Sequence, residues 1–396
     1  MSQRGSVLDA GTTARLSAAT AHVAGPVAVV DLDAFEANAV DLVHRAGGTP
    51  VRVASKSVRV RGLLDDVLAR PGWAGGMAYS LAEALWLAEH GHTDVLVGYP
   101  SVDRASLARL AASPEARSRI TVMVDDAAQL ALLPRLGSGG PPVQVCLDVD
   151  ASWRVGPVHL GARRSPVHTP ADAAALAGAC ARTDGVEVRG LMFYEAQVAG
   201  LPDVSPAVRF VKRRSIVDLA TRRAAVLDAV TAALGYRPPL VNSGGTGSLE
   251  SSSADPVVTE VTAGSGLLLP ALFDGYRNVR PRPAAFLGLD VVRSPAPGLV
   301  TVFAGGYPAS GPAGRSRLPR VVGPPGARLL RSEGAGEVQT PVRLPPGMDL
   351  GVGDRVWFRH AKAGELMERV REVHLVRGDA VVGTLPTYRG EGRAFG

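Results

Sequence analysis

Lysine is rare in this chain, and one copy stands where covalent chemistry can use an amine. Lysine and arginine together number 43, but lysine itself occurs only at positions 56, 212 and 362. Lys56 follows the short β-branched run Val51–Ser55. A lysine at the end of a strand, facing a pocket, is a common place for a Schiff base to a carbonyl cofactor. The alternative is that arginine dominance reflects coding bias and Lys56 is a surface cation.

A glycine-rich segment supplies a second chemical signal. It directly follows the strand-like run Pro239–Asn242, and its candidate phosphate-binding members are Ser243, Gly244, Gly245, Thr246, Gly247 and Ser248. Consecutive glycines expose backbone N–H groups, and the hydroxyls add further donors. A second small-residue cluster, which includes Gly264 and Ser265, follows the next run. A flexible turn is the alternative, but (β/α)8 barrels commonly bind phosphate with the loops after strands 7 and 8.

An amine and a phosphate anchor at the same end of one barrel are what pyridoxal 5′-phosphate (PLP) requires. An aldolase that forms a Schiff base with a phosphosugar would need the same pair. The residues alone leave both classes open.

Four other side chains could assist such a site. Arg154 follows the fifth predicted strand and could hold a phenolate oxygen or a substrate carboxylate, although an isolated arginine is more often in a surface ion pair. Tyr194 ends the sixth strand and could stack on a cofactor or be a rim residue. His360 and Lys362 lie two residues apart, which would place them on one face of a strand. They could supply a proton acceptor and a donor, or form an exposed polar strand end.

Eight short apolar runs that alternate with helical patterns must position these residues. The predicted strands are Val51–Ser55, Trp73–Tyr79, Asp94–Tyr99, Ile120–Val124, Val143–Val149, Val186–Phe193, Pro239–Asn242 and Val258–Ala263. The predicted helices between them are Gly62–Ala69, Ser80–His90, Arg104–Ala112, Ala127–Leu136, Pro170–Thr183 and Pro206–Leu234. Continuous apolar strands separated by helices predict a parallel sheet. Their number and spacing favour an α/β fold of the (β/α)8 TIM-barrel type over a doubly wound open sheet.

A second domain is expected after about residue 280, where helical patterning stops. Pro/Gly-rich connections there separate short runs such as Ala284–Val292 and Arg355–Arg359, which predicts a β-rich C-terminal domain. The expected division is an N-terminal segment 1–24 that packs on the C-terminal domain, a barrel 25–280 that includes a strand Val27–Leu32 and a helix Asp33–Arg45, and the C-terminal domain 281–396.

Composition excludes several other classes of protein. The net charge of +6 comes from arginine spread along the chain, and its densest runs fall in a predicted helix, so no nucleic-acid partner is expected. The two cysteines form no CxxC motif, and Cys146 lies in an apolar run typical of a buried, reduced thiol. No run reaches the roughly 18 apolar residues that a membrane span needs. With no signal-peptide pattern, a cytoplasmic protein without a membrane partner is expected.

Taken in order, these segments resemble the alanine racemase-like, fold-type III PLP enzymes. The resemblance rests on Pro26–Asp33, Arg52–Ser57, Asp150 with Arg154–Gly156, Ser243–Ser248 and His360, and covers roughly residues 25–385. Within that group the chain is most similar to the D-threonine aldolase and D-serine dehydratase-like branch. The resemblance implies a PLP-binding barrel, a β-rich domain and a homodimer. It also implies a Schiff base at Lys56, a contact from Arg154 to a cofactor oxygen and phosphate binding by the 243–248 loop.

One departure concerns a divalent metal. The aldolase and dehydratase branch carries His-x-Cys or His-x-Asp near the C-terminus, whereas this chain has His360-Ala361-Lys362. An ammonium group cannot replace an anionic ligand and would repel a cation. His360 is then the only plausible ligand, no metal site is predicted, and Lys362 is expected to act electrostatically where the metal would sit.

The sequence therefore predicts a PLP-dependent lyase. Its substrate would be a small β-hydroxy amino acid of D configuration, processed by retro-aldol cleavage or deamination through a Schiff base at Lys56. An amino-acid racemase is the alternative enzyme. A PLP carrier without turnover is disfavoured by the second domain, because such carriers are single barrels.

Overall fold

A computed structural model describes residues 8–134, 136, 139–280 and 282–396. The chain divides into two compact units, which are described separately. The barrel unit comprises 41–56, 64–264 and 395–396, and the sheet unit comprises the chain up to Val40, 57–63 and 265–394.

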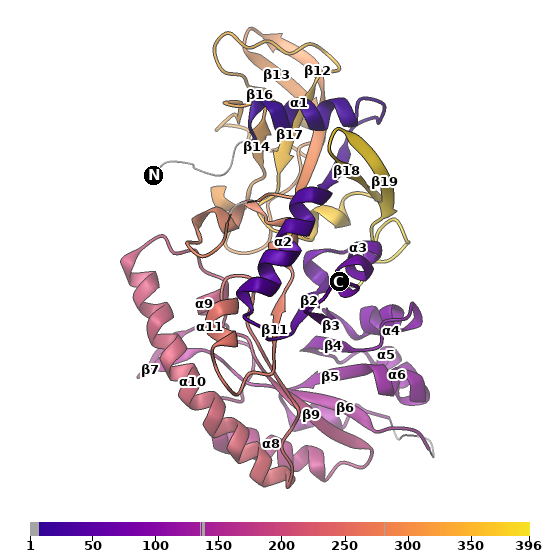
Figure 1. The fold of residues 1–396 in the computed structure, drawn as a ribbon, viewed down its shortest axis with the longest axis vertical. Helices are drawn as coiled ribbons and strands as arrows, with labels where there is room; N and C mark the ends of the chain where they lie inside the picture. The colour runs from indigo at the N-terminus through magenta and orange to yellow at the C-terminus, as the bar shows by residue number, and fades with distance from the viewer. Residues whose placement is uncertain (1–7, 135, 137–138, 281) are drawn as a thin grey trace. The chain divides into compact units, whose positions relative to one another are not determined.

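The barrel unit is built on a closed, eight-stranded parallel barrel, as the sequence predicts. Figure 1 shows its strands side by side. In order around the barrel they are β10 (Leu240–Ser243), β11 (Glu260–Ala263), β2 (Val51–Ala54), β3 (Trp73–Ala78), β4 (Val95–Pro100), β5 (Ile120–Val124), β6 (Val143–Asp148) and β9 (Val186–Phe193). Every strand agrees with a predicted run to within a few residues, because these runs are short, apolar and bounded by turns.

The barrel interior is filled in layers. The central layer is apolar and contains Leu96, Met123, Cys146, Met192 and Leu240. A polar layer lies nearer the strand beginnings. There, buried Arg52 binds Glu260 at 2.6 Å and Asp94 at 2.9 Å. Since side chains alternate between the two faces of a strand, the residues two positions after the apolar layer face the carboxyl-end mouth of the barrel. Asp148 and Tyr194 stand at such positions.

Helices follow most of the barrel strands. They are α3 (Arg61–Leu68), α4 (Leu81–Glu89), α5 (Arg104–Ala112), α6 (Pro114–Arg119), α7 (Ala127–Leu130), α8 (Pro170–Ala181), α9 (Ala196–Ala199), α10 (Pro206–Leu234) and α11 (Leu249–Ser253). The prediction of α10 is correct at both ends. Ser205 caps its first turn, Pro206 takes the first position, and Gly235 ends it in a left-handed conformation with φ 76°. Two short strands, β7 (Trp153–Val155) and β8 (Val158–Leu160), form a hairpin after β6.

The sheet unit contains a nine-stranded sheet. Seven strands form the main path: β15 (Arg328–Leu329), β16 (Gln339–Arg343), β13 (Leu299–Phe303), β12 (Ala285–Ala296), β1 (Val27–Asp31), β18 (Glu372–Arg377) and β19 (Ala380–Pro386). Strands β14 (Arg320–Gly323) and β17 (Arg355–Arg359) pair beside them, with β17 on β12. The predicted β-rich second domain is confirmed.

The beginning of the chain joins this sheet. Strand β1 pairs antiparallel with β12 and parallel with β18, so the predicted strand at 27–32 is not a barrel strand. Helix α1 (Ala10–Ala19) buries Leu16 in a cluster with Val29, Phe286 and Trp357. The expected ranges therefore differ from the compact units in where 25–40, 57–63, 265–280 and 395–396 fall. Helices α2 (Leu32–Arg45) and α12 (Ser265–Leu268) complete the regular structure. Among the described residues, no helix is long and apolar enough to cross a bilayer.

Candidate active site

Lys56 lies directly after β2, in a single 3-10 turn (Ser55–Ser57) at the carboxyl end of the barrel. Its Nζ atom is 2.5 Å from the hydroxyl oxygen of Tyr99, a residue of β4. Burial by itself would raise the pKa of Tyr99, but the cationic Lys56 and Arg164 beside it outweigh burial, so that pKa is lowered. The amine and the phenol thus form a pair that can share or pass a proton.

Arg164 completes this cluster, and sequence reasoning missed it. Its guanidinium lies 5.6 Å from the centroid of the Tyr99 ring and 5.4 Å from that of Tyr194. Burial raises the pKa of Tyr194, which stays a neutral phenol. Arg164 belongs to an irregular segment in a chain rich in arginine, so neither periodicity nor composition distinguishes it.

Arg154, the predicted cofactor contact, is placed differently. It lies in the β7–β8 hairpin, its side chain is 40% exposed, and its guanidinium binds Asp150 at 2.6 Å. The carboxylate of Asp150 also accepts from the backbone N–H and hydroxyl of Ser152, so it anchors the hairpin. The described contacts bring Arg164, not Arg154, to Lys56. A cofactor contact by Arg154 remains a prediction.

The glycine-rich loop follows β10 at the same end of the barrel. Gly244 adopts φ +89°, a left-handed conformation that favours glycine. A Cβ atom on Gly245 would come within 2.9 Å of the Ala199 Cβ, so the backbone approaches its neighbour closely there. Arg45 holds the carbonyl oxygen of Thr246 at 2.7 Å. The loop therefore has a defined shape and is not a loose turn.

Glu195 is a further functional candidate that sequence reasoning missed, as it missed Tyr99 and Arg164. Its carboxylate is 1% exposed and accepts hydrogen bonds from the root of the glycine loop, including the Ser248 hydroxyl at 2.9 Å. Glutamate is rarely buried unless it is paired, so only the folded structure reveals this role.

Gly264 and Ser265, the second predicted cluster, follow β11. Gly264 is buried. Ser265 begins α12, where its hydroxyl is 3.0 Å from that of Ser57. The hydrogen bond shows that Ser265 has a defined place in the sheet unit, while phosphate binding by either residue remains a prediction.

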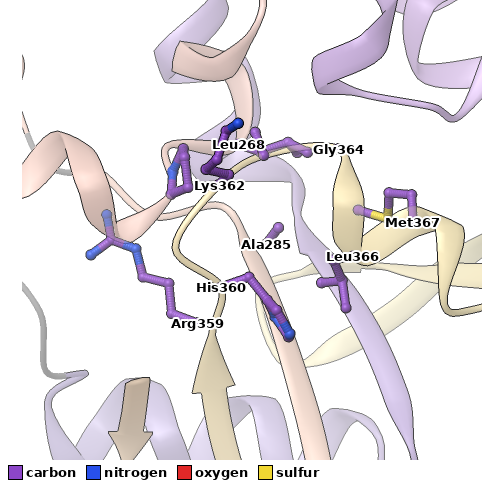
Figure 2. Close-up of a pocket in the computed structure, with 10 residues that line it drawn as sticks. Leu268, Ala285, Arg359, His360, Lys362, Gly364, Leu366 and Met367 are labelled. Atoms are coloured by element: carbon purple, nitrogen blue, oxygen red, sulfur yellow. The ribbon is translucent and has the colours of Figure 1, made fainter. Parts of the chain in front are cut away.

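His360 lines a pocket of the sheet unit (Figure 2). The prediction that His360 and Lys362 share a strand face is wrong, because β17 ends at Arg359 and both residues lie in the following turn. The imidazole stacks on Tyr307 with a centroid distance of 5.1 Å. Neither ring nitrogen has a hydrogen-bond partner among the described residues. Burial, aided by Arg369, lowers the pKa of His360 to about 4, so the ring is neutral at pH 7.

Lys362 lines the same pocket, and its Nζ atom is 2.5 Å from the Ser310 hydroxyl. Within the described part of the chain, no group of three His, Cys, Asp or Glu side chains is arranged to hold a metal ion. Because an ammonium group stands two residues from the histidine, the donor set here does not fit a divalent cation.

The depressed pKa of His360 predicts a pH-dependent loss of stability. An unfolded histidine protonates near pH 6.5, whereas the folded one resists protonation down to about pH 4. The unfolded chain therefore binds more protons between these values, and stability falls as pH drops through that window, by about 3 kcal/mol from this residue. The variant His360→Phe keeps a stacking ring and should lose this component. Urea unfolding across this range measures it, with the exposed His22→Phe as control; an unchanged slope in His360→Phe would refute the assignment.

Comparisons with known proteins identify the family. Residues 30–270, well over half of the chain, match the family described as alanine racemase, N-terminal domain. The chain belongs to this family, and its barrel with a separate β-rich domain matches the alanine racemase-like architecture. Membership implies PLP as the cofactor.

Individual relatives show which members of this group the chain is similar to. The chain is 26% identical to 3-hydroxy-D-aspartate aldolase of Paracoccus denitrificans over 348 residues, covering 81% of this chain and 84% of that protein. The crystal structure of D-threonine aldolase from Filomicrobium marinum superposes with a TM-score of 0.79 at 23% identity, over 93% of this chain and 96% of that one. D-threo-3-hydroxyaspartate dehydratase from Delftia sp. HT23 gives a TM-score of 0.69 at 21% identity, over 92% and 97%. These two likenesses show the fold.

Proposed function

We propose that this protein is a PLP-dependent lyase that acts on a β-hydroxy amino acid of D configuration, by retro-aldol cleavage or deamination. The observation that carries the proposal is the Lys56–Tyr99 pair at the barrel mouth, at the same strand ends as the shaped glycine loop after β10. The curated aldolase that the chain resembles supports the substrate class. A phosphosugar aldolase would use an amine and a phosphate site too, but family membership favours PLP.

The residues of the barrel fit this cofactor. PLP when bound supplies an electron sink for negative charge at the substrate Cα. Lys56 would hold the cofactor covalently and, once released, would accept or return a proton. The Tyr99 hydroxyl, 2.5 Å from Nζ, would relay that proton. Arg164, between two aromatic rings, would bind an anionic oxygen, and the loop 243–248 would bind the phosphate.

The proposed acid–base groups are His360 and Lys362. His360 would take the proton of a substrate β-hydroxyl: its ring is neutral at pH 7 and both its nitrogens lack partners among the described residues, while its lowered pKa makes it a weak base. Lys362 would donate to the substrate hydroxyl or carboxylate in place of a metal ion. The donor set supports this role, because it offers a cation where a divalent ion would need anionic ligands.

A charge-replacement series tests the role of Lys362. Activity of the native enzyme should be insensitive to chelator. Lys362→Met should lower kcat/KM by about 10- to 100-fold, the effect expected for loss of a charge-assisted hydrogen bond. Lys362→Arg, the matched control, should retain more activity because it keeps the charge. Lys362→Asp, which introduces a carboxylate two residues after the histidine, should gain activity with added divalent ions. Full activity in Lys362→Met would end the proposal for this residue.

Proton NMR with a panel of D- and L-amino acids in D2O tests the reaction itself. Glycine plus an aldehyde, or a keto acid plus ammonia, would establish a lyase and separate the two modes. Loss of the α-proton signal with no new carbon skeleton would mean a racemase and would overturn the lyase proposal.

We also propose that the protein works as a cytoplasmic homodimer without nucleic-acid or membrane partners. The dimer rests on the resemblance to fold-type III enzymes, and the other three statements rest on composition. Sedimentation equilibrium of the PLP-loaded chain measures the oligomeric state, and a monomer would contradict the dimer.

A further inference from the structure

A buried carboxylate occupies the root of the loop expected to bind phosphate. Glu195 Oε2 accepts from the Ser243 hydroxyl at 2.8 Å and from the Gly244 N–H at 3.2 Å. Glu195 Oε1 accepts from the Ser248 hydroxyl at 2.9 Å and from the Ser252 hydroxyl. Three of these four donors belong to the loop itself. Glu195 therefore ties both ends of the loop to the segment after β9, in addition to the contact between the Ser243 hydroxyl and the Phe193 carbonyl oxygen at 2.7 Å.

The charges around Glu195 argue against a direct role in attracting phosphate. Among the described ion pairs, the guanidinium of Arg223 is 3.6 Å from Glu195 and 3.0 Å from Asp255. One cation thus faces two buried carboxylates, which leaves a net negative charge beneath the loop. A negative charge there would repel a phosphate dianion. The contribution of Glu195 must then be geometric, because its hydrogen bonds fix the backbone of the loop 243–248.

The neighbour of Glu195 shows what the shaping serves. Tyr194 precedes it in the chain, and a Cβ atom on Gly245 would lie 3.7 Å from the ring of Tyr194. Tyr194 faces the barrel mouth, where its ring also meets Arg164. The ring and the phosphate of PLP belong to one small molecule. The side chain that contacts the ring and the loop that binds the phosphate must therefore stay at a fixed distance from each other.

We propose that Glu195 is a positioning residue that holds the phosphate loop 243–248 in register with Tyr194. This rests on the proposed function, in that the ligand is PLP. Glutamine at this position would keep the size of the side chain but would set an amide N–H against one of its donors. If the amide carbonyl takes the place of Oε2, the N–H of Gly244 keeps its acceptor, but the NH2 group then faces the hydroxyls of Ser248 and Ser252, which lose their shared acceptor and must turn away. The loop should then relax at its root.

The test separates the phosphate from the ring. Dissociation constants for PLP and for pyridoxal, which lacks the phosphate, are measured by fluorescence titration of the cofactor-free full chain. For Glu195→Gln we expect PLP affinity to fall about 10- to 100-fold, as for a buried donor left unpaired. Pyridoxal affinity should change by less than about threefold, since that ligand does not use the loop. The ratio of the two constants is a readout that general destabilisation would not move.

Two further variants keep the test decisive. Ser252→Ala removes one donor to Glu195 without altering the loop, and should shift the ratio in the same direction by a smaller factor. If Glu195→Gln fails to fold, Ser252→Ala serves as the test variant in its place. Glu187→Gln changes an exposed glutamate at the start of β9, the strand before Glu195, and should leave the ratio unchanged.

Any other change in the two affinities would contradict the positioning role of Glu195. A rise in PLP affinity would mean that the carboxylate competes with phosphate for the same donors. An equal fall for both ligands would mean a general structural role, and no change would mean no role. If the native chain itself failed to bind PLP, the proposed function would fall. Native binding with an unaltered ratio in the variants would refute only the positioning role.

Discussion

Replacing Lys56 by alanine should abolish covalent attachment of PLP and lower turnover by at least about 10²- to 10⁴-fold, the range for loss of a positioned proton-transfer group. The reason is that the described contacts place this amine alone among the three lysines against Tyr99 at the barrel mouth. Borohydride reduction of the native, PLP-loaded chain followed by peptide mass spectrometry should find the pyridoxyl label on Lys56.

A lysine control separates this effect from damage to the fold. Lys212 lies in α10, is buried, and binds Asp203 at 2.9 Å. Lys212→Arg keeps that ion pair and should retain both label and activity. Labelling of Lys212 or Lys362 in the native chain, or near-native turnover by Lys56→Ala, would contradict the assignment of Lys56.

Replacing Asp148 by asparagine should stabilise the barrel at alkaline pH. Asp148 follows Cys146 by two positions on β6, so its side chain faces the barrel mouth, and it is buried. Burial, with the charges of Asp125 and Asp150, raises its pKa to about 7, although Arg164 opposes the rise. The described contacts include no hydrogen bond or ion pair to its carboxyl group, so the charge of Arg164 offsets only part of the cost of ionisation.

The sign of this effect is opposite to that for His360. An unfolded aspartate ionises near pH 3.9, but the folded Asp148 keeps its proton to about pH 7. Between these values the folded chain binds more protons, so stability falls as pH rises, by about 4 kcal/mol in total from this group. Asp148→Asn should match the native chain near pH 4 and exceed it above pH 8 by up to that amount. Urea unfolding at both ends of the range checks it.

An exposed aspartate provides the control for Asp148. Asp184, in the turn before β9, is exposed, and Asp184→Asn should follow the native curve at every pH. If Asp148→Asn were no more stable than the native chain above pH 8, ionisation of the Asp148 carboxyl group would not destabilise the fold. Its partners, including Arg164, would then have to be reassigned.

Much of the architecture could be predicted from the sequence because its signals are local. The barrel strands are short β-branched runs between turn residues, and α10 is bounded by Ser205, Pro206 and Gly235, each with a preference that acts over a few positions. Strand β1 shows the limit of such signals. Its apolar run specifies a strand but not a partner, and pairing with β12 and β18 depends on segments more than 250 residues away.

The candidate site likewise has some residues that could be recognised from the sequence and others that could not. Lys56 and the loop 243–248 were recognisable because a rare amine and a run of glycines each carry a chemical meaning of their own. Arg164 and Glu195 were not, because arginine is common in this chain and a buried glutamate has no sequence signature. His360 and Lys362 were assigned to a strand that ends one residue earlier.

The sequence by itself therefore determined the order of the strands and helices and the positions of Lys56 and the glycine loop directly after their strands, since each depends on neighbours along the chain. Only the tertiary structure decided that Arg164 accompanies Lys56 and Tyr99, and that Glu195 engages the root of the loop. These contacts join residues that are tens of positions apart. They depend on the closure of the barrel and on the path of irregular segments, which no local preference encodes.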